Sequence, residues 1–293
     1  MYLSSITARP ACSPSVCRTP CYIADRRGII FTTLAGMPND PEWPSLVGRV
    51  TEKLARAQRL MAELEDEPDH RRGSYFYGHR GFSIGQGQKR PGNLRNSARR
   101  QEILEELRTD PDVIRVANFA NGALHNYVPN VFDVYKDNMD ALLEWDPSLQ
   151  RNFPNNVFAA ATFNLRPRVA THVHLDLLNY AYGMCAVFAA GNYDYKQGGH
   201  IILWDAKLII EFPPGATILL PSAILRHSNV TIRPHETRYS LTQYTAGGLF
   251  RWVRAGFRTQ KSLQAAGLDL SNEYEEWKEG WRMYPTVDQM YSP

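Results

Sequence analysis

Short apolar runs follow one another closely in the second half of the chain, and this pattern constrains the fold more than any other feature of the sequence. Short apolar or alternating runs bounded by glycine and proline turn signals, such as Gly198-Gly199 and Pro213-Pro214-Gly215, are typical of strands. About eight such strands predict a jelly-roll barrel, the double-stranded β-helix. The runs are Val157 to Asn164, His172 to Tyr180, Met184 to Ala190, His200 to Trp204, Leu208 to Phe212, Thr217 to Pro221, His227 to Ile232 and Arg238 to Thr245.

The first half of the chain has a mainly helical pattern. From Trp43 onward, apolar residues recur at alternating spacings of three and four between Val47 and Leu64, which predicts one amphipathic helix. Together with the strands, these helices predict an α+β fold whose jelly-roll core is buttressed by N-terminal helices. Further helices are expected from Asn96 or Ser97 to Arg108, from Pro111 to near Pro129, and from there to about Trp145.

Length and composition allow one large domain or two small ones, because 293 residues with 43% hydrophobic content can bury a sizeable core. We predict a partly irregular leader over 1–42 and a single domain over 43–260. The helical and loop part of that domain spans 43–155 and the jelly-roll core spans 156–250. A C-terminal extension over 261–293 is expected to pack on the domain.

Charge and hydropathy restrict the surroundings of the protein. The sequence has no long apolar run for a membrane span, and its first residues lack the apolar core of a signal peptide, so we expect an intracellular protein. A net charge of +3 neither demands nor excludes a polyanionic partner. Cys12, Cys17 and Cys21 lack a C-x-x-C pair, which favours a loose leader over a zinc or disulfide site, and Cys185 is expected in the core.

His174 and Asp176 flank Leu175 in one predicted strand. Side chains at i and i+2 share a face of a strand, so both can point into the barrel. A third ligand, His227, would come from a distant strand, and two imidazoles with one carboxylate are the ligand set of non-haem Fe(II) sites. An alternative pairing of His172 with His174 remains open, although it lacks a carboxylate at the usual spacing.

Arg238 and Ser240 follow His227 and share one face of the last predicted strand. A guanidinium binds a carboxylate through two parallel hydrogen bonds, and a serine hydroxyl adds another donor. These residues can therefore seat the distal carboxylate of 2-oxoglutarate. Asn164 and Asn179 are candidates for holding the other end of that molecule.

With these residues in place, the chain resembles the TET/JBP-like dioxygenases that are numerous in mushroom-forming fungi. The resemblance covers roughly residues 73 to 257 and rests on the metal-ligand motif and on several phrases. Those phrases are GQGQKRPGNL at 85–94, NVFAAATFN at 156–164, GGHIILWDAKLIIEFPPGATILLPSAILRHSNV at 198–230 and ETRYSLTQYTAGGLFRWV at 236–253.

The resemblance implies a dioxygenase that uses Fe(II), 2-oxoglutarate and O2 to oxidise a methyl group on a base of DNA. The leading substrate is 5-methylcytosine, oxidised to 5-hydroxymethylcytosine and further, with N6-methyladenine as a second possibility. It also implies that His174, Asp176 and His227 bind iron, that Arg238 and Ser240 bind 2-oxoglutarate, and that the protein resides in the nucleus. A base stacked in a duplex cannot reach a buried metal, so the target base must be single-stranded or flipped out.

Two segments carry side chains suited to DNA. Residues 73–97 are predicted to form a long loop with a strand around Phe82, and residues 251–261 would form one basic stripe if they were helical. A solvated face explains that stripe equally well. Candidates for stacking on a base are Tyr75, Phe76, Tyr77, His79 and Phe82; candidates for phosphate contacts are Arg71, Arg72, Arg80, Lys89, Arg90, Arg95, Arg99, Arg100, Arg251, Arg254, Arg258 and Lys261.

Three other functions are compatible with the sequence. The same barrel and ligands serve oxygenases that act on protein side chains or metabolites. A non-catalytic DNA-binding barrel is a second alternative, against which the intact ligand set argues, and an RNA-base oxidase is a third. No obligate protein partner is indicated.

Overall fold

The computed structural model of the protein describes residues 20–64, 69–70, 73–74, 76–85, 87–267 and 279–291. Of the residues singled out from the sequence, Cys12, Cys17, Arg71, Arg72 and Tyr75 lie outside this set.

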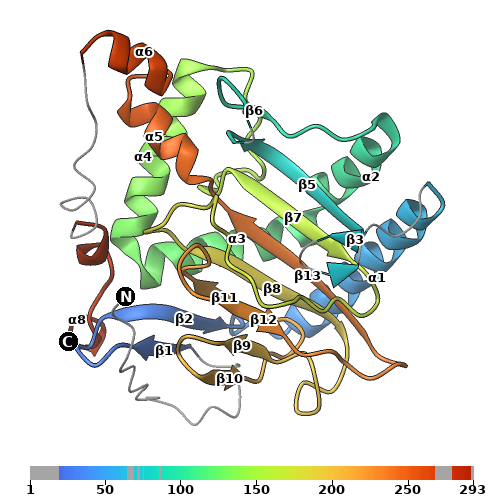
Figure 1. The fold of residues 1–293 in the computed structure, drawn as a ribbon. Helices are drawn as coiled ribbons and strands as arrows, with labels where there is room; N and C mark the ends of the chain where they lie inside the picture. Colours follow the sequence, from blue (N-terminus) through green and yellow to red (C-terminus); the bar gives the residue numbers. More distant parts are fainter. Residues whose placement is uncertain are drawn as a thin grey trace.

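The centre of the fold is an eight-stranded sheet in which every neighbouring pair is antiparallel. A smaller three-stranded sheet carries β10 (Leu208–Ile210), β9 (Ile201–Leu203) and β12 (His227–Asn229), and β3 (Asp69–His70) pairs with β4 (Gly73–Ser74). In order, the large sheet holds β1 (Cys21–Ala24), β2 (Ile30–Gly36), β11 (Thr217–Leu220), β8 (Cys185–Asn192), β13 (Thr237–Tyr244), β7 (Ala160–Leu165), β5 (Phe76–Ser83) and β6 (Gly92–Asn93) (Figure 1).

The two sheets face each other and share a core. Ile201 and Leu203 of the small sheet pack in one buried cluster with Ile218 and Leu220 of the large one. Strands of the large sheet alternate between this interior and the opposite face, because successive side chains of a strand point to opposite sides. The arrangement is the predicted double-stranded β-helix.

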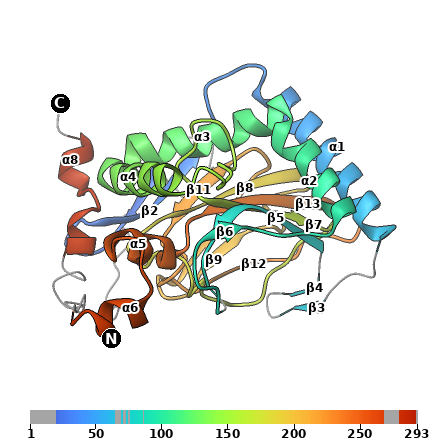
Figure 2. The same ribbon diagram turned by 90° about the horizontal axis from the view of Figure 1, so that it is seen from above.

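Helices cover the other face of the large sheet, as Figure 2 shows for α1 (Trp43–Ala62), α2 (Ala98–Thr109), α3 (Pro111–Tyr127) and α4 (Pro129–Trp145). Prolines stand in the first turns of α1, α3 and α4, where their missing N–H costs nothing. The predicted helices and the break near Pro129 are therefore confirmed, and so is the α+β fold class. Three short helices follow the barrel: α5 (Gly247–Arg254), α6 (Gln260–Ala265) and α8 (Val287–Tyr291).

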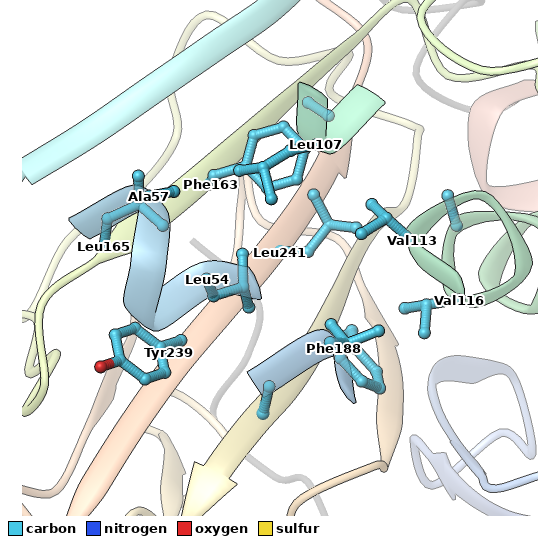
Figure 3. Packing of buried hydrophobic residues seen from close by; sticks show 14 of the residues in the cluster. Leu54, Ala57, Leu107, Val113, Val116, Phe163, Leu165, Phe188, Tyr239 and Leu241 are labelled. Atoms are coloured by element: carbon cyan, nitrogen blue, oxygen red, sulfur yellow. The ribbon is translucent and has the colours of Figure 1, made fainter. Parts of the chain in front are cut away.

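The helices attach to the sheet through apolar side chains. Leu54 of α1 and Leu107 of α2 pack with Phe163 of β7 and Leu241 of β13 in one buried cluster (Figure 3). Each fully buried side chain of this size contributes about 1.5 to 3 kcal/mol. The indole Nε1 of Trp43 also donates to the carbonyl of Gly215 over 3.0 Å, which ties the start of α1 to the barrel.

The predicted leader is wrong for residues 21–36, because β1 and β2 belong to the large sheet. Every residue of β2 is buried and the strand pairs with β11, so the domain does not begin at Trp43 and the barrel strands are not confined to 156–250. The run from Ile29 to Ala35 is a strand signal that the prediction overlooked. Near the C-terminus, Thr286 bridges to Ile29 and the side chain of Tyr284 is buried.

The predicted long loop over 73–97 contains an eight-residue strand, β5, paired with β7. Glycines in its sequence weaken the strand pattern but have a packing role. A Cβ at Gly78 would lie 2.2 Å from Cδ2 of Leu104, so α2 sits directly on β5. One predicted strand, His172 to Tyr180, is instead an irregular extended segment with only isolated bridges, and the other predicted strands have counterparts.

Within the described residues, no helix combines the length and the apolar character needed to cross a bilayer.

Candidate metal centre and cavity

Two backbone hydrogen bonds bring His174 and His227 together. The amide of each residue donates to the carbonyl of the other over 3.1 Å. Directly opposed residues of an antiparallel pair present their side chains on one face, and the two ring centroids lie 4.3 Å apart. His227 begins β12, so the small sheet carries one ligand, and the irregular segment bridged to it at this point carries the other.

Asp176 completes the group from the same segment as His174. Its backbone amide donates to the carbonyl of Ser222 over 2.9 Å, and its own carbonyl accepts from the amide of Asn179 over 2.8 Å. The carboxylate is buried, with Oδ1 3.8 Å from Nε2 of His174 and Oδ2 4.0 Å from Nε2 of His227. The predicted i, i+2 geometry is therefore produced by a turn held on Ser222 instead of by a regular strand.

Backbone carbonyls orient both imidazoles. Nδ1 of His174 donates to the carbonyl of His172 over 2.7 Å, and Nδ1 of His227 donates to the carbonyl of Leu225 over 2.8 Å. A carbonyl can only accept, so Nδ1 carries a proton in both residues, and Nε2 of each ring is turned toward the carboxylate of Asp176. Metal-ligating histidines use this second hydrogen bond to fix their tautomer.

The three side chains fit a metal ion. One ligand atom from each of His174, Asp176 and His227 lies within 4.8 Å of the others, and the donors are two imidazoles and a carboxylate. That donor set suits a non-haem Fe(II) site with further positions for other ligands. The alternative pairing of His172 with His174 is not realised among the described residues, because the metal-ligating group there is His174, Asp176 and His227 and His172 is exposed.

A cavity of about 450 Å³ lies between the two sheets and is lined by the three ligands and by Arg238 and Ser240. Cavities of this size are typical of small-molecule sites. Strand β13 builds one wall, because Arg238, Ser240, Thr242 and Tyr244 alternate with residues that pack toward the helices.

Arg238 carries a buried charge, and no carboxylate among the described residues pairs with it. It is 2% exposed, and its Nη1 donates one long hydrogen bond of 3.4 Å to the carbonyl of Val169. Its Nε is buried without a hydrogen-bond partner in the described part of the chain. A buried cation left in this state is costly unless an anion pairs with it, so the cavity is built to receive a negatively charged group.

Ser240 and Asn164 stand opposite each other in the pairing of β13 with β7. Nδ2 of Asn164 donates to Oγ of Ser240 over 2.9 Å, which leaves the serine proton available for another acceptor. Asn179 also lines the cavity, and its Nδ2 donates to Oγ of Ser222 over 3.0 Å. Both predicted asparagines therefore border the cavity, each with its amide group already oriented.

The predicted stacking residues divide into two groups. His79 lines the cavity, and Tyr77 lies beside it with a centroid distance of 5.9 Å. Phe82 is 0% exposed and Phe76 is also buried, both on the face of β5 that joins the core, so the expectation that they stack on a base is wrong. The strand alternation that hides Phe76 and Phe82 is what presents Tyr77 and His79.

The predicted phosphate-binding residues also divide. Arg80 is buried and paired with Glu105, so its assignment to phosphate is wrong. Arg90 pairs with Asp146 over 2.6 Å and stands over the ring of Trp145, and Arg99 pairs with Glu102. Arg100 is partly buried and contacts the ring of Tyr77. The side chains of Lys89, Arg95, Arg251 and Arg254 are exposed.

The predicted basic stripe does not lie on one helix. Helix α5 ends at Arg254, and Gly256 and Phe257 both have φ of 61°, which no continuing helix allows. Arg258 falls in the connection and Lys261 in α6, so the four basic residues do not share a helix face.

Several cavity residues were missed by the sequence reasoning. Thr242 and Tyr244 follow Ser240 at spacings of two on β13, which is a signal that could have revealed them. Thr162 stands opposite Thr242 on β7, and its Oγ1 lies 3.2 Å from the hydroxyl of Tyr244. Leu178, which is 60% exposed, also borders the cavity, and no short motif marks it.

Comparison with solved structures agrees with this architecture. NgTET1, solved in complex with 5mC DNA, is similar over 78% of this chain and 76% of its own, with a TM-score of 0.53 and 15% sequence identity. A similarity at this level of identity establishes the fold. Two further structures have TM-scores below 0.5 and add nothing to that argument. One is an oxidoreductase of the 2OG-Fe(II) oxygenase family from Burkholderia pseudomallei, with a TM-score of 0.35 and 18% identity over 71% of this chain and 91% of that one. The other is OsALKBH1, with a TM-score of 0.34 and 13% identity over 66% of this chain and 92% of that one.

A scan of the sequence against models of protein families finds no match, and a search of curated proteins finds no matching relative.

Proposed function

We propose that the protein is an Fe(II)- and 2-oxoglutarate-dependent dioxygenase. The observation that carries the proposal is the buried guanidinium of Arg238, which lines the same cavity as His174, Asp176 and His227. Metal ligands beside a buried cation fit a co-substrate that binds the metal with one end and pairs with the cation through a carboxylate at its other end. Of the common co-substrates of non-haem iron, 2-oxoglutarate has this form.

The residues that line the cavity would bind the iron and the distal carboxylate of 2-oxoglutarate. When bound, Fe(II) supplies the activation of O2 coupled to oxidation of 2-oxoglutarate, and the cofactor chemistry does the difficult step. His174, Asp176 and His227 would hold the ion, with both imidazoles kept in the Nδ1–H form by backbone carbonyls. Arg238 would pair with the distal carboxylate, and Ser240 would donate its hydroxyl proton to the same group.

We further propose that the substrate is the methyl group of a modified DNA base, with 5-methylcytosine the leading candidate and N6-methyladenine the second. Support comes from the sequence phrases that resemble the fungal TET/JBP-like dioxygenases and from the shared fold of NgTET1 in its complex with 5mC DNA. Membership of that fungal group and residence in the nucleus belong to the same proposal.

The cavity must then accept a base that has left the stack. Its wall carries His79, Thr162 and Tyr244, and Leu178 stands exposed at the border. Lys89, Arg95 and Arg251 present exposed cations that can contact phosphates, which predicts binding that is sensitive to salt and weakly selective for sequence.

Nucleoside mass spectrometry tests this function. DNA that contains both 5-methylcytosine and N6-methyladenine is incubated with the protein, Fe(II), 2-oxoglutarate and air, and Asp176→Ala is the control. We expect oxidised methyl products that require both 2-oxoglutarate and Asp176, and the product ratio identifies the preferred base. Succinate formed without any change in the DNA would keep the oxygenase and reject the DNA substrate; RNA, protein and metabolite pools would then be tested in the same assay.

A further inference from the structure

The polar wall of the cavity is organised by strand register. Three antiparallel pairings set residues side by side across β13, β7 and β5: Thr242 stands opposite Thr162, and Thr162 stands opposite His79. All three side chains line the cavity. His79 is therefore aligned, through Thr162, with Thr242 on the strand that carries Arg238 and Ser240. His79 is not among the residues proposed to bind 2-oxoglutarate.

His79 stands in surroundings that favour its uncharged form. Burial lowers the pKa of His79, and the nearby charge of Arg100 lowers it further, against the smaller opposite effect of the Arg95 carbonyl. Both causes favour the uncharged imidazole, in which one nitrogen is a donor and the other keeps a lone pair.

The position of the ring is also constrained. A Cβ at Gly78 would lie 2.2 Å from a side-chain atom of Leu104, so β5 is seated against α2 on its far face. The ring of Tyr77 lies 5.9 Å from that of His79, and Nδ2 of Asn96 donates to the backbone carbonyl of His79 over 3.0 Å. The acceptor nitrogen is thus carried by a rigid element, as residues that determine specificity need to be.

We propose that His79 reads the target base, its second ring nitrogen accepting a hydrogen bond from an exocyclic amino group. This inference rests on the proposed function. Cytosine carries an amino donor at N4, whereas thymine carries an oxygen acceptor at O4. 5-Methylcytosine and thymine have the same methyl group at C5, so this one edge distinguishes them. An acceptor facing O4 would leave two acceptors opposed without a proton, which a buried site rejects strongly.

Two matched oligonucleotides test the inference. They are single-stranded, have the same sequence and differ only in carrying one 5-methylcytosine or one thymine, and the measured quantity is the ratio of their kcat/KM values for methyl oxidation. We expect wild type to prefer 5-methylcytosine by at least about tenfold. His79→Leu removes the acceptor and should reduce that preference about tenfold, whereas His79→Gln, which keeps an acceptor oxygen, should restore part of it.

Two controls separate folding and function from recognition. A rise in Tm on adding 2-oxoglutarate with Co(II) reports that each variant is folded and keeps the co-substrate site. His125→Leu, the same replacement at an exposed residue of α3 that does not line the cavity, should leave the 5-methylcytosine to thymine ratio unchanged. If wild type oxidises the methylcytosine oligonucleotide and His79→Leu keeps the full preference, the inference about His79 is wrong, whereas the proposed DNA substrate stands. If wild type oxidises neither oligonucleotide, the proposed DNA substrate and the inference both fall.

Discussion

His174 and His227 exchange two backbone hydrogen bonds of 3.1 Å, so each imidazole is placed by the main chain of the other residue. The metal centre is therefore built at a junction between β12 and an irregular segment, and not within one continuous strand. A ligand in such a segment depends on its anchoring contacts, here the amide of Asp176 on the carbonyl of Ser222.

Metal affinity should depend on Asp176 and not on His172. Asp176→Ala removes the only carboxylate of the three-residue group in the described chain, and we expect Co(II) to bind at least about tenfold more weakly. His172→Ala is the matched control, because His172 is exposed and the variant keeps the backbone carbonyl that accepts from His174. Calorimetric titration with Co(II) measures both, and equal weakening in the two variants would contradict the assignment.

Removal of the buried cation should separate stability from function. Arg238→Met takes away a guanidinium with no carboxylate partner in the described structure, so we expect the Tm without ligand to stay the same or rise. The 2-oxoglutarate concentration for half-maximal turnover should increase by an order of magnitude or more. Arg226→Met, which removes an exposed arginine paired with Asp205, is the control. An unchanged 2-oxoglutarate requirement in Arg238→Met would place the carboxylate site elsewhere.

Phe82 should act on stability and leave DNA binding unaffected. Its side chain is 0% exposed and packs with Met139 and Leu249. Phe82→Ala should lower the free energy of unfolding by about 3 to 5 kcal/mol, measured by urea denaturation. Phe82→Leu, which loses less volume, should retain the DNA affinity of wild type. A selective loss of DNA affinity in a fully folded Phe82→Leu protein would restore its predicted stacking role.

Exposed cations beside the cavity should set the salt dependence of DNA binding. Lys89→Ala or Arg95→Ala should reduce the slope of log K against log salt by about 1 if the removed charge contacts a phosphate. Lys136→Ala on α4, on the opposite face of the sheet and paired with Asp140, should leave the slope unchanged. Fluorescence anisotropy over a range of salt concentrations measures these slopes. Identical slopes for all three variants would exclude phosphate contacts by Lys89 and Arg95.

Stability should fall in acid through an ion-pair cluster between α1 and α3. The Arg49 guanidinium, with help from Lys53, holds the pKa of Asp112 well below its usual range, through contacts of 2.7 to 2.9 Å. A lowered folded-state pKa gives stability that is present above the unfolded value, about 3.9, and is lost as pH falls through the folded value. Asp112→Asn should therefore lower the urea midpoint at pH 7, and its difference from wild type should shrink below about pH 4. Glu52→Gln, an exposed acid on α1, should show no such pattern.

The sequence was sufficient for the features that a local pattern encodes. Alternating strands and the amphipathic α1 predicted the barrel and its helical cover, and the i, i+2 spacing of His174 and Asp176 predicted which side chains meet at one point. Ser240 and Asn164 also border the cavity where they were expected. Each of these predictions depends on short-range periodicity.

The errors arose where distant contacts decide the structure. Strand β2 has a local strand signal, but its place between β1 and β11 and the burial of both its faces depend on residues distant in the sequence. The segment from His172 to Tyr180 has strand-like composition, but its hydrogen bonds go to Ser222, His227 and Thr245 at separate points, so it never forms a ladder. The sequence around Arg80 does not distinguish it from the neighbouring basic residues, because its partner Glu105 lies on α2.

The alternation along β7 and β13 limits how this protein can change over evolutionary time. Every second residue faces the cavity and the others pack against the helices, so inserting or deleting one residue would exchange the two sets along the rest of the strand. Single replacements on these strands can therefore change the cavity lining, whereas a change in strand length would not preserve it. Insertions should be tolerated in turns such as Asp205 to Lys207, which link strands of the small sheet and leave the register of the cavity wall intact.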